Sequence, residues 1–207
     1  MITIGLTGGI CCGKSTVAKT FIDHNIPVIS ADQVARDVVV PGSLGLEQVI
    51  GLFGKKFLLP DGTLNRKTLG DLIFTDKEAL RQIDAIMGPL IHHESQRQIN
   101  VLHQNRNGLF DGPSIVCYDA ALVVEYGRHH LFRPLVVAHC DQETQIQRLM
   151  KRGTGHGPLT REEAMDRIAS QLPMEEKIKM ADYLVDTSSS IEHSIDQTIQ
   201  IIEKIRQ

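Results

Sequence analysis

Glycines, a lysine and a serine near the N-terminus have the types and spacing that bind phosphate groups. Residues 8–15 read GGICCGKS, which fits the phosphate-loop pattern G-x-x-x-x-G-K-[ST]. In such a loop backbone N–H groups turn toward phosphate oxygens, Lys14 reaches the outer phosphates and the Ser15 hydroxyl binds Mg²⁺. The pattern predicts that a nucleoside triphosphate contacts Gly9, Ile10, Cys11, Cys12, Gly13, Lys14, Ser15 and Thr16.

Two further groups of side chains could take part in phosphoryl transfer. Asp32 and Arg36 follow a short apolar stretch, residues 26–30, and lie one helical turn apart. Ligands of open α/β sheets collect at the carboxyl ends of strands, so we expect both to face the cleft of the phosphate loop. The alternative, an N-cap aspartate with a surface arginine, remains open from the residues alone.

Arg148 and Arg152 precede a glycine-rich segment, residues 153–158. We expect a mobile lid whose cations meet the transferring phosphates, with a solvated basic turn as the alternative. Asp119 ends the apolar stretch of residues 114–118 and resembles a Walker B carboxylate that orders Mg²⁺ through water.

The elements that must position these residues alternate between apolar strands and amphipathic helices. This alternation predicts an α/β three-layer P-loop NTPase fold with a parallel, doubly wound sheet of five strands. Helical periodicity dominates residues 41–107, with turn signals only at 60–62 and at Gly88-Pro89. We expect a single domain, residues 1–207, with a nucleotide core at about 1–60 and 113–207, a helical acceptor-binding insert at about 61–112 and a lid at about 148–162.

Composition excludes several classes of function. A net charge of −3 over 207 residues argues against nucleic acid or an anionic membrane as a partner. No apolar run is long enough to span a membrane, and the N-terminus lacks the pattern of a signal peptide. Four cysteines fit neither a zinc site nor a disulfide framework, so we expect a cytoplasmic protein with reduced thiols. We also expect either a monomer or a weak homo-oligomer.

With these residues in place, the sequence resembles the dephospho-CoA kinase family over nearly its whole length. The resemblance rests on the segments GLTGGICCGKST, SADQVAR, DGTLNRKTL, GPLI, YDAALVVE, RIASQLP and ADYLVD, in this order. It implies transfer of the γ-phosphate of ATP, with Mg²⁺, to the ribose 3′-hydroxyl of dephospho-CoA. It also implies that Asp32 is the catalytic base, assisted by Lys14, Arg148 and Arg152. Arg36, Arg66 and Gln171 are implied to contact the acceptor together with Asp32.

The sequence departs from the family pattern at several positions. Cys11 and Cys12 stand where glycine and serine are usual, so position 11 is expected to adopt a backbone conformation that a side chain tolerates. Gly88 replaces a usual histidine, Ala121 a usual proline, and residues 187–189 differ near the adenine loop. Thiols beside Lys14 at a helix N-terminus also suggest sensitivity to oxidants, against the alternative of two tolerated small residues.

Two other functions remain as alternatives. Another small-metabolite or nucleoside kinase would share the phosphate loop and the lid, and would differ in the acceptor contacts. A nucleotide-dependent switch or motor is disfavoured, because the sequence has no N-K-x-D motif and Ala120 follows Asp119 where a motor needs a second acid.

Overall fold

The computed structural model describes residues 1–106, 114–153 and 157–207 of the chain. The last residues of the expected insert, 107–112, and the middle of the expected lid, 154–156, lie outside the described residues. The strands are β1 (Ile2–Gly8), β2 (Val28–Ser30), β3 (Ile115–Asp119), β4 (Leu135–His139) and β5 (Tyr183–Asp186). The α-helices are α1 (Lys14–Asp23), α2 (Ala31–Asp37), α3 (Leu44–Phe53), α4 (Arg66–Thr75), α5 (Lys77–Arg106), α6 (Gln142–Arg152), α7 (Arg161–Ala169), α8 (Met174–Lys179) and α9 (Ile191–Arg206), with 3₁₀ turns η1 (Lys55–Phe57) and η2 (His129–Leu131).

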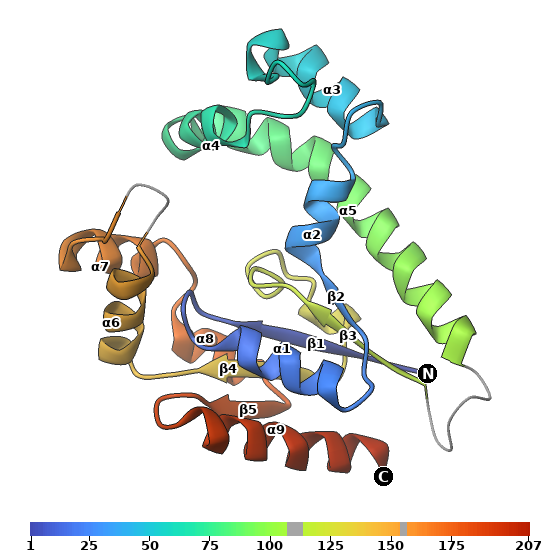
Figure 1. Ribbon diagram of the computed structural model, residues 1–207, viewed down its shortest axis with the longest axis vertical. Coiled ribbons are helices and arrows are strands. Elements are labelled where there is room, and N and C mark those ends of the chain that lie inside the picture. Colours follow the sequence, from blue (N-terminus) through green and yellow to red (C-terminus); the bar gives the residue numbers. More distant parts are fainter. Residues whose placement is uncertain (107–113, 154–156) are drawn as a thin grey trace. The chain divides into compact units, whose positions relative to one another are not determined.

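The strands of the described residues form one five-stranded sheet in the order β2-β3-β1-β4-β5 (Figure 1). β1 is central and pairs in parallel with β3 and β4, in registers that place Leu6 opposite Asp119 and Gly8 opposite Ala138. β4 pairs in parallel with β5. The carboxyl ends of these strands therefore lie along one edge, and the predicted parallel α/β fold is confirmed.

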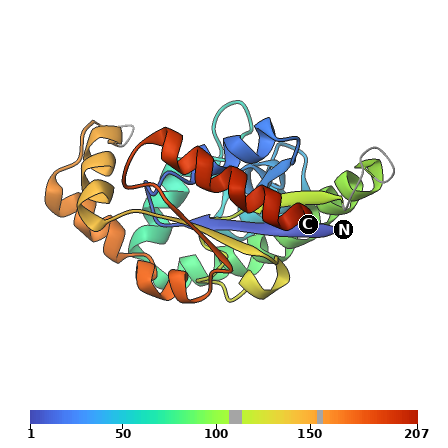
Figure 2. The same cartoon turned by 90° about the horizontal axis from the view of Figure 1, so that it is seen from below.

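Alternation along β1 sends successive side chains to opposite faces of the sheet. Ile4 and Leu6 are buried in an apolar core with Phe21 of α1 and Ile202 of α9. Seen from below, α9 lies over this side of the strands and α8 lies on the other side (Figure 2). The opposite face of the sheet contains the polar side chain of Thr7, which is fully buried.

The described chain divides into two compact units. Unit 1 comprises residues Met1–Ile29 and Leu102–Gln207, and it holds β1, β3, β4, β5 and the helices α1 and α6 to α9. Unit 2 comprises Ser30–Val101, whose helices pack around a separate apolar core that includes Val49, Phe57 and Ile83. The expected insert at 61–112 thus lies mainly in unit 2.

The structure corrects one turn prediction within α5. Gly88 and Pro89 were expected to mark a turn, but they lie inside a continuous helix with Pro89 in its interior. Proline removes one backbone hydrogen bond, yet apolar side chains in the turns before it, Ile83 and Met87 among them, pack into the core of unit 2. Tertiary packing outweighs the local helix-breaking preference at this position.

None of the helices in the described ranges is both long enough and apolar enough to cross a membrane.

Candidate active site

The phosphate loop connects β1 to α1 through two left-handed residues. Cys11 has φ 58° and Gly13 has φ 68°, and the turn is closed by Cys12 N–H donating to Gly9 O at 3.1 Å. Alternation of right- and left-handed residues turns successive N–H groups toward one point and forms an anion-binding nest. Gly13 is also the N-cap of α1 and supplies no side-chain cap, so the first N–H groups of this helix are free of side-chain acceptors and oriented for phosphate oxygens.

The conformation of Cys11 corrects an expectation. A side chain at position 11 was expected to require a conformation that side chains tolerate readily, but Cys11 adopts the left-handed region that favours glycine. For a residue with a Cβ this region costs about 1–2 kcal/mol relative to the right-handed one. The loop therefore keeps the geometry of a phosphate nest and places the strain on Cys11.

Lys14 and Asp119 form an ion pair near the carboxyl ends of the parallel strands β1 and β3. Lys14 is the first residue of α1 and Asp119 is the last residue of β3, and both side chains are largely buried. The pair holds the ammonium group beside the phosphate loop. Asp119, expected to order Mg²⁺, thus lies beside the lysine of the phosphate loop.

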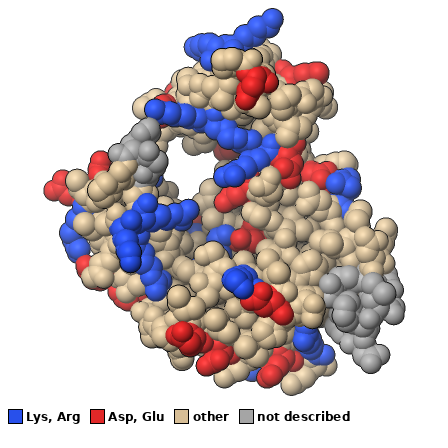
Figure 3. All heavy atoms as spheres, viewed as in Figure 1, with Lys and Arg blue, Asp and Glu red and all other residues tan. Residues whose placement is uncertain are grey.

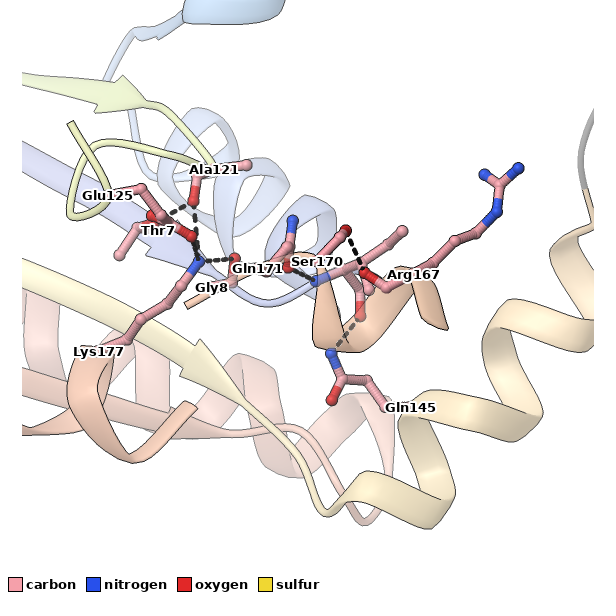
Figure 4. A network of polar contacts seen from close by, with 10 residues as sticks. Thr7, Gly8, Ala121, Glu125, Gln145, Arg167, Ser170, Gln171 and Lys177 are labelled. Atoms are coloured by element: carbon pink, nitrogen blue, oxygen red, sulfur yellow. Dashed lines mark hydrogen bonds and ion pairs between the residues drawn. The ribbon is translucent and has the colours of Figure 1, made fainter. Parts of the chain in front are cut away.

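Two glutamine side chains hold the peptide groups of Ile10 within the loop. Ile10 N–H donates to Gln171 Oε1 at 2.8 Å, and Gln145 Nε2 donates to Ile10 O at 2.8 Å (Figure 4). Gln145 lies on α6 and is buried, whereas Gln171 follows α7. Helix α6 and the segment that follows α7, on the two sides of the expected lid, are therefore hydrogen-bonded to the backbone of the phosphate loop.

A cavity of about 300 Å³ lies beside the loop on the α6 side. Arg148 projects to its wall and donates to Thr187 O at 2.6 Å and to Thr187 Oγ1 at 3.2 Å. Thr187 Oγ1 also lies 3.1 Å from Cys12 O, so this side chain connects the loop to β5. The cavity is lined by Cys11, Gly13, Ser15, Thr16, Arg148, Arg152, Thr187, Ser189, Ser190, Ile191 and Ser194.

Both arginines predicted for the lid, Arg148 and Arg152, thus face the same cavity as Ser15. Lys and Arg side chains gather on the part of unit 1 that α6 and α7 form (Figure 3). A capping box opens α7, with the side chains of Thr160 and Glu163 each accepting from the other's backbone N–H group. Arg161 pairs with Glu143 of α6 at 2.7 Å, which links the two helices at their exposed surface.

Unit 2 brings the predicted acceptor-side residues of α2 and α4 together. Asp32 lies exposed in the first turn of α2, whose N-cap is Ser30 rather than Asp32. Arg66, the first residue of α4, donates to Arg36 O at 3.3 Å. Partial desolvation of its otherwise exposed side chain and the neighbouring charge of Arg36 lower the pKa of Arg66. Two guanidinium groups held near each other in this way form a site suited to an anion.

Three side chains that support the phosphate loop were not predicted from the sequence. Gln145, Thr187 and Lys177 contact the loop or the strand that enters it, although they are 135 to 175 positions away from their partners. They belong to no local motif, so their role becomes visible only when the sheet brings them together.

Comparison with known proteins agrees with this geometry. A family model described as Dephospho-CoA kinase matches residues 2–193. A dephospho-CoA kinase of Listeria innocua is 38% identical over 203 residues, which cover 98% of this chain and 96% of the relative. The structure of a dephospho-CoA kinase from Campylobacter jejuni is 25% identical with a TM-score of 0.65, covering 99% of this chain and 97% of that one. A shikimate kinase from Bacteroides thetaiotaomicron, 17% identical with a TM-score of 0.54 over 98% of both chains, shares the fold.

Proposed function

The chain belongs to the dephospho-CoA kinase family, and from this membership we propose how its residues share the work of the reaction. The enzyme is an ATP-dependent phosphotransferase that transfers the γ-phosphate of ATP to the 3′-hydroxyl of dephospho-CoA, which completes coenzyme A synthesis. The observation that carries the assignment of residues is the phosphate loop itself, with its nest at the start of α1 and the arginine-lined cavity beside it.

On the donor side, the residues Gly9 to Thr16 bind the phosphates of ATP. Lys14 leaves Asp119 to contact the outer phosphates, while Arg148 and Arg152 neutralise charge that spreads over the transferring group. The nucleoside of ATP occupies the cavity lined by Thr187 and Ser189, which is supported by its position against Gly13.

Asp32 and the arginines of unit 2 act on the acceptor. Asp32 accepts the proton of the 3′-hydroxyl as the 3′-oxygen bonds to the γ-phosphorus and the bond to the bridging oxygen of ADP breaks. Arg36 and Arg66 contact the diphosphate of dephospho-CoA, which is supported by the hydrogen bond from Arg66 to Arg36 O and by the electrostatic effect of Arg36 on Arg66. Gln171 contacts the acceptor through its amide nitrogen, since its oxygen accepts from Ile10.

The oxygen donors at the loop fit Mg²⁺. Ser15 has an exposed hydroxyl in the first turn of α1, and Asp119 presents a carboxylate at the end of β3. Hydroxyl and carboxylate oxygens are the ligands that this hard cation prefers. Ser15 would hold Mg²⁺ and Asp119 would order it through water, and the bound ion would neutralise phosphate charge.

The chain acts as a single kinase domain with a core, a helical insert that binds the CoA moiety and a lid at about 148–162. We place it in the cytoplasm, as a monomer or a weak homo-oligomer. The location is supported by the four cysteines, Cys11, Cys12, Cys117 and Cys140, which are all free thiols.

The test of the assignment is the substitution Asp32→Asn, measured by ADP release from MgATP with and without dephospho-CoA. We expect acceptor-dependent turnover to fall at least about a hundredfold, the lower range for a general base. Asp37→Asn on the same helix is the matched control, because Asp37 is exposed and accepts a hydrogen bond from Gln33 one turn earlier, at 2.8 Å. Turnover that survives Asp32→Asn would reduce Asp32 to an orienting group, and turnover without acceptor dependence would refute the assignment.

A further inference from the structure

Lys177 of α8 has no exposed surface, although it carries a charge. Among the described residues it is the only Lys, Arg, Asp or Glu that is buried. Removing an ammonium group from water costs several kcal/mol unless hydrogen bonds and an opposite charge compensate. The contacts of Lys177 therefore show which groups compensate the cost of burying its ammonium group.

The Lys177 ammonium group can donate three protons, and each has an acceptor near the carboxyl ends of β1 and β3. Lys177 Nζ lies 2.6 Å from Glu125 Oε1, 3.1 Å from Ala121 O and 3.4 Å from Gly8 O (Figure 4). Thr7 Oγ1 donates to the same carbonyl of Ala121 at 3.0 Å. Within the described residues, the carboxylate of Glu125 has no hydrogen-bond partner beyond this ion pair.

These contacts connect the start of the phosphate loop, which carries Lys14, with the segment that follows Asp119. Gly8 is the last residue of β1 and the first of the phosphate loop, while Ala121 lies two residues beyond Asp119. Position 8 lies close against β4 and has no room for a side chain, since a Cβ there would lie 2.4 Å from Ala138 O. A change in the position of the Lys177 ammonium group would therefore move the loop against the segment of Asp119.

Stability alone does not account for this buried pair. Replacing a buried ion pair by apolar side chains of similar volume is often neutral or stabilising, whereas removing one partner is strongly destabilising. An ion pair buried at the base of the phosphate loop therefore points to a role in positioning the loop rather than in stabilising the fold.

We propose that Lys177, held by Glu125, is a positioning residue for phosphoryl transfer that fixes the phosphate loop relative to the Asp119 segment. It touches neither ATP nor the acceptor and acts through the carbonyl groups of Gly8 and Ala121. This inference rests on the proposed function, because the loop must bind the phosphates of ATP.

The test separates position from stability with two variants. Lys177→Met leaves Glu125 buried without a partner, so we expect a lower melting temperature as well as lower activity. The double variant Lys177→Met with Glu125→Leu removes both charges, and we expect its melting temperature to recover toward the wild-type value. Its kcat/KM for MgATP is expected to stay roughly tenfold to a hundredfold low, the scale of a displacement of about 1 Å at a reacting group.

The affinity for dephospho-CoA is measured beside kcat/KM for MgATP. It is expected to be unchanged in the double variant. Lys179→Met with Glu176→Gln serves as the control pair, because it removes an exposed ion pair from the same helix. A double variant that recovers both melting temperature and kcat/KM for MgATP would overturn the proposal and leave Lys177 a structural residue.

Glu125→Gln keeps the inference testable if the Lys177 variants do not fold, since it retains the size of the side chain and a hydrogen-bond acceptor. Its dissociation constant for MgATP, measured by isothermal titration calorimetry, is expected to rise at least about tenfold, and a wild-type value overturns the proposal. This readout needs no acceptor. Wild-type protein that binds MgATP without acceptor-dependent turnover would contradict the proposed function instead.

Discussion

At the scale of single residues, the two adjacent thiols of the phosphate loop have different surroundings. Cys11 is half-buried and lines the cavity beside Ser15, while Cys12 is fully buried. The Sγ atoms of Cys12 and Cys140 are 3.6 Å apart, and the thiol of Cys140 donates to Cys12. This contact lowers the pKa of Cys12 and raises the pKa of Cys140, but neither sulfur is accessible to a reagent without opening of the fold.

Thiol reagents are therefore expected to act first at Cys11. Treatment with N-ethylmaleimide should modify this thiol before the three buried ones and block the phosphate site. Burial raises the pKa of Cys117 well above its usual value, so this residue is expected to react last. The measurement is the rate of inactivation, with the modified residues identified by peptide mass spectrometry.

Cys11→Ser is the control variant for this inactivation. It removes the accessible thiol and leaves Cys12, Cys117 and Cys140 in place, so its activity should resist the reagent. Saturating MgATP should also protect the wild-type protein. Equal inactivation of wild type and Cys11→Ser, or labelling that MgATP does not slow, would refute the sensitivity of this loop to thiol chemistry.

At the scale of elements, the side chain of His103 connects the C-terminal end of α5 to the sheet. His103 is buried, with Nε2 3.0 Å from Thr3 Oγ1 of β1 and Nδ1 3.0 Å from Ser114 Oγ, next to β3. Burial lowers the pKa of His103, and the positive charge of the Met1 amino group lowers it further. The ring is thus neutral in the folded protein at pH values where it takes up a proton in the unfolded chain.

This difference predicts that the protein loses stability in mild acid. Below the unfolded pKa of about 6.5 the unfolded state binds more protons at His103 than the folded state, so the unfolding free energy falls as the pH decreases from 7. One proton contributes a slope of at most about 1.4 kcal/mol per pH unit. Urea unfolding at a series of pH values from 7 to 5 measures it.

His103→Gln should flatten this part of the pH profile, because glutamine keeps hydrogen-bonding capacity and does not titrate. The matched control is His92→Gln, which removes an exposed histidine from the same helix. A profile as steep in His103→Gln as in wild type would show that other groups cause the loss.

The elements also show how far the sequence predicts this molecule. The strands and the loop of residues 8–16 were predictable because periodicity and motif are local properties of the chain. The interior position of Pro89 was not, since the core of unit 2 determines it. Gln145, Thr187 and Lys177 were not predictable as supports of the loop, because their partners are reached only through the folded sheet.

At the scale of the whole molecule, the division into two units separates the proposed ligand contacts. The proposed ATP contacts lie in unit 1, together with the acceptor contact Gln171, whereas the acceptor contacts Asp32, Arg36 and Arg66 lie in unit 2. Each unit has its own apolar core, so a substitution of an exposed side chain in one unit need not disturb the other. The two substrates should therefore stabilise the protein through different residues.

Thermal unfolding in the presence of each ligand tests this separation. A ligand at about a hundred times its dissociation constant adds about 2.7 kcal/mol to the unfolding free energy. For a chain of this length this corresponds to a rise in Tm of roughly 5–11 °C. Lys14→Met should lose the rise caused by MgATP and keep the rise caused by dephospho-CoA.

Arg36→Met combined with Arg66→Met should show the reverse pattern in the same calorimetric experiment. Both arginines are exposed, so the double variant is expected to fold like the wild type without ligand. Loss of both rises in either variant would mean that the substrates share these residues and would contradict the separation. Because each variant serves as the control for the other, a general loss of stability appears as a change in the unliganded Tm and not as a selective loss of one ligand's effect.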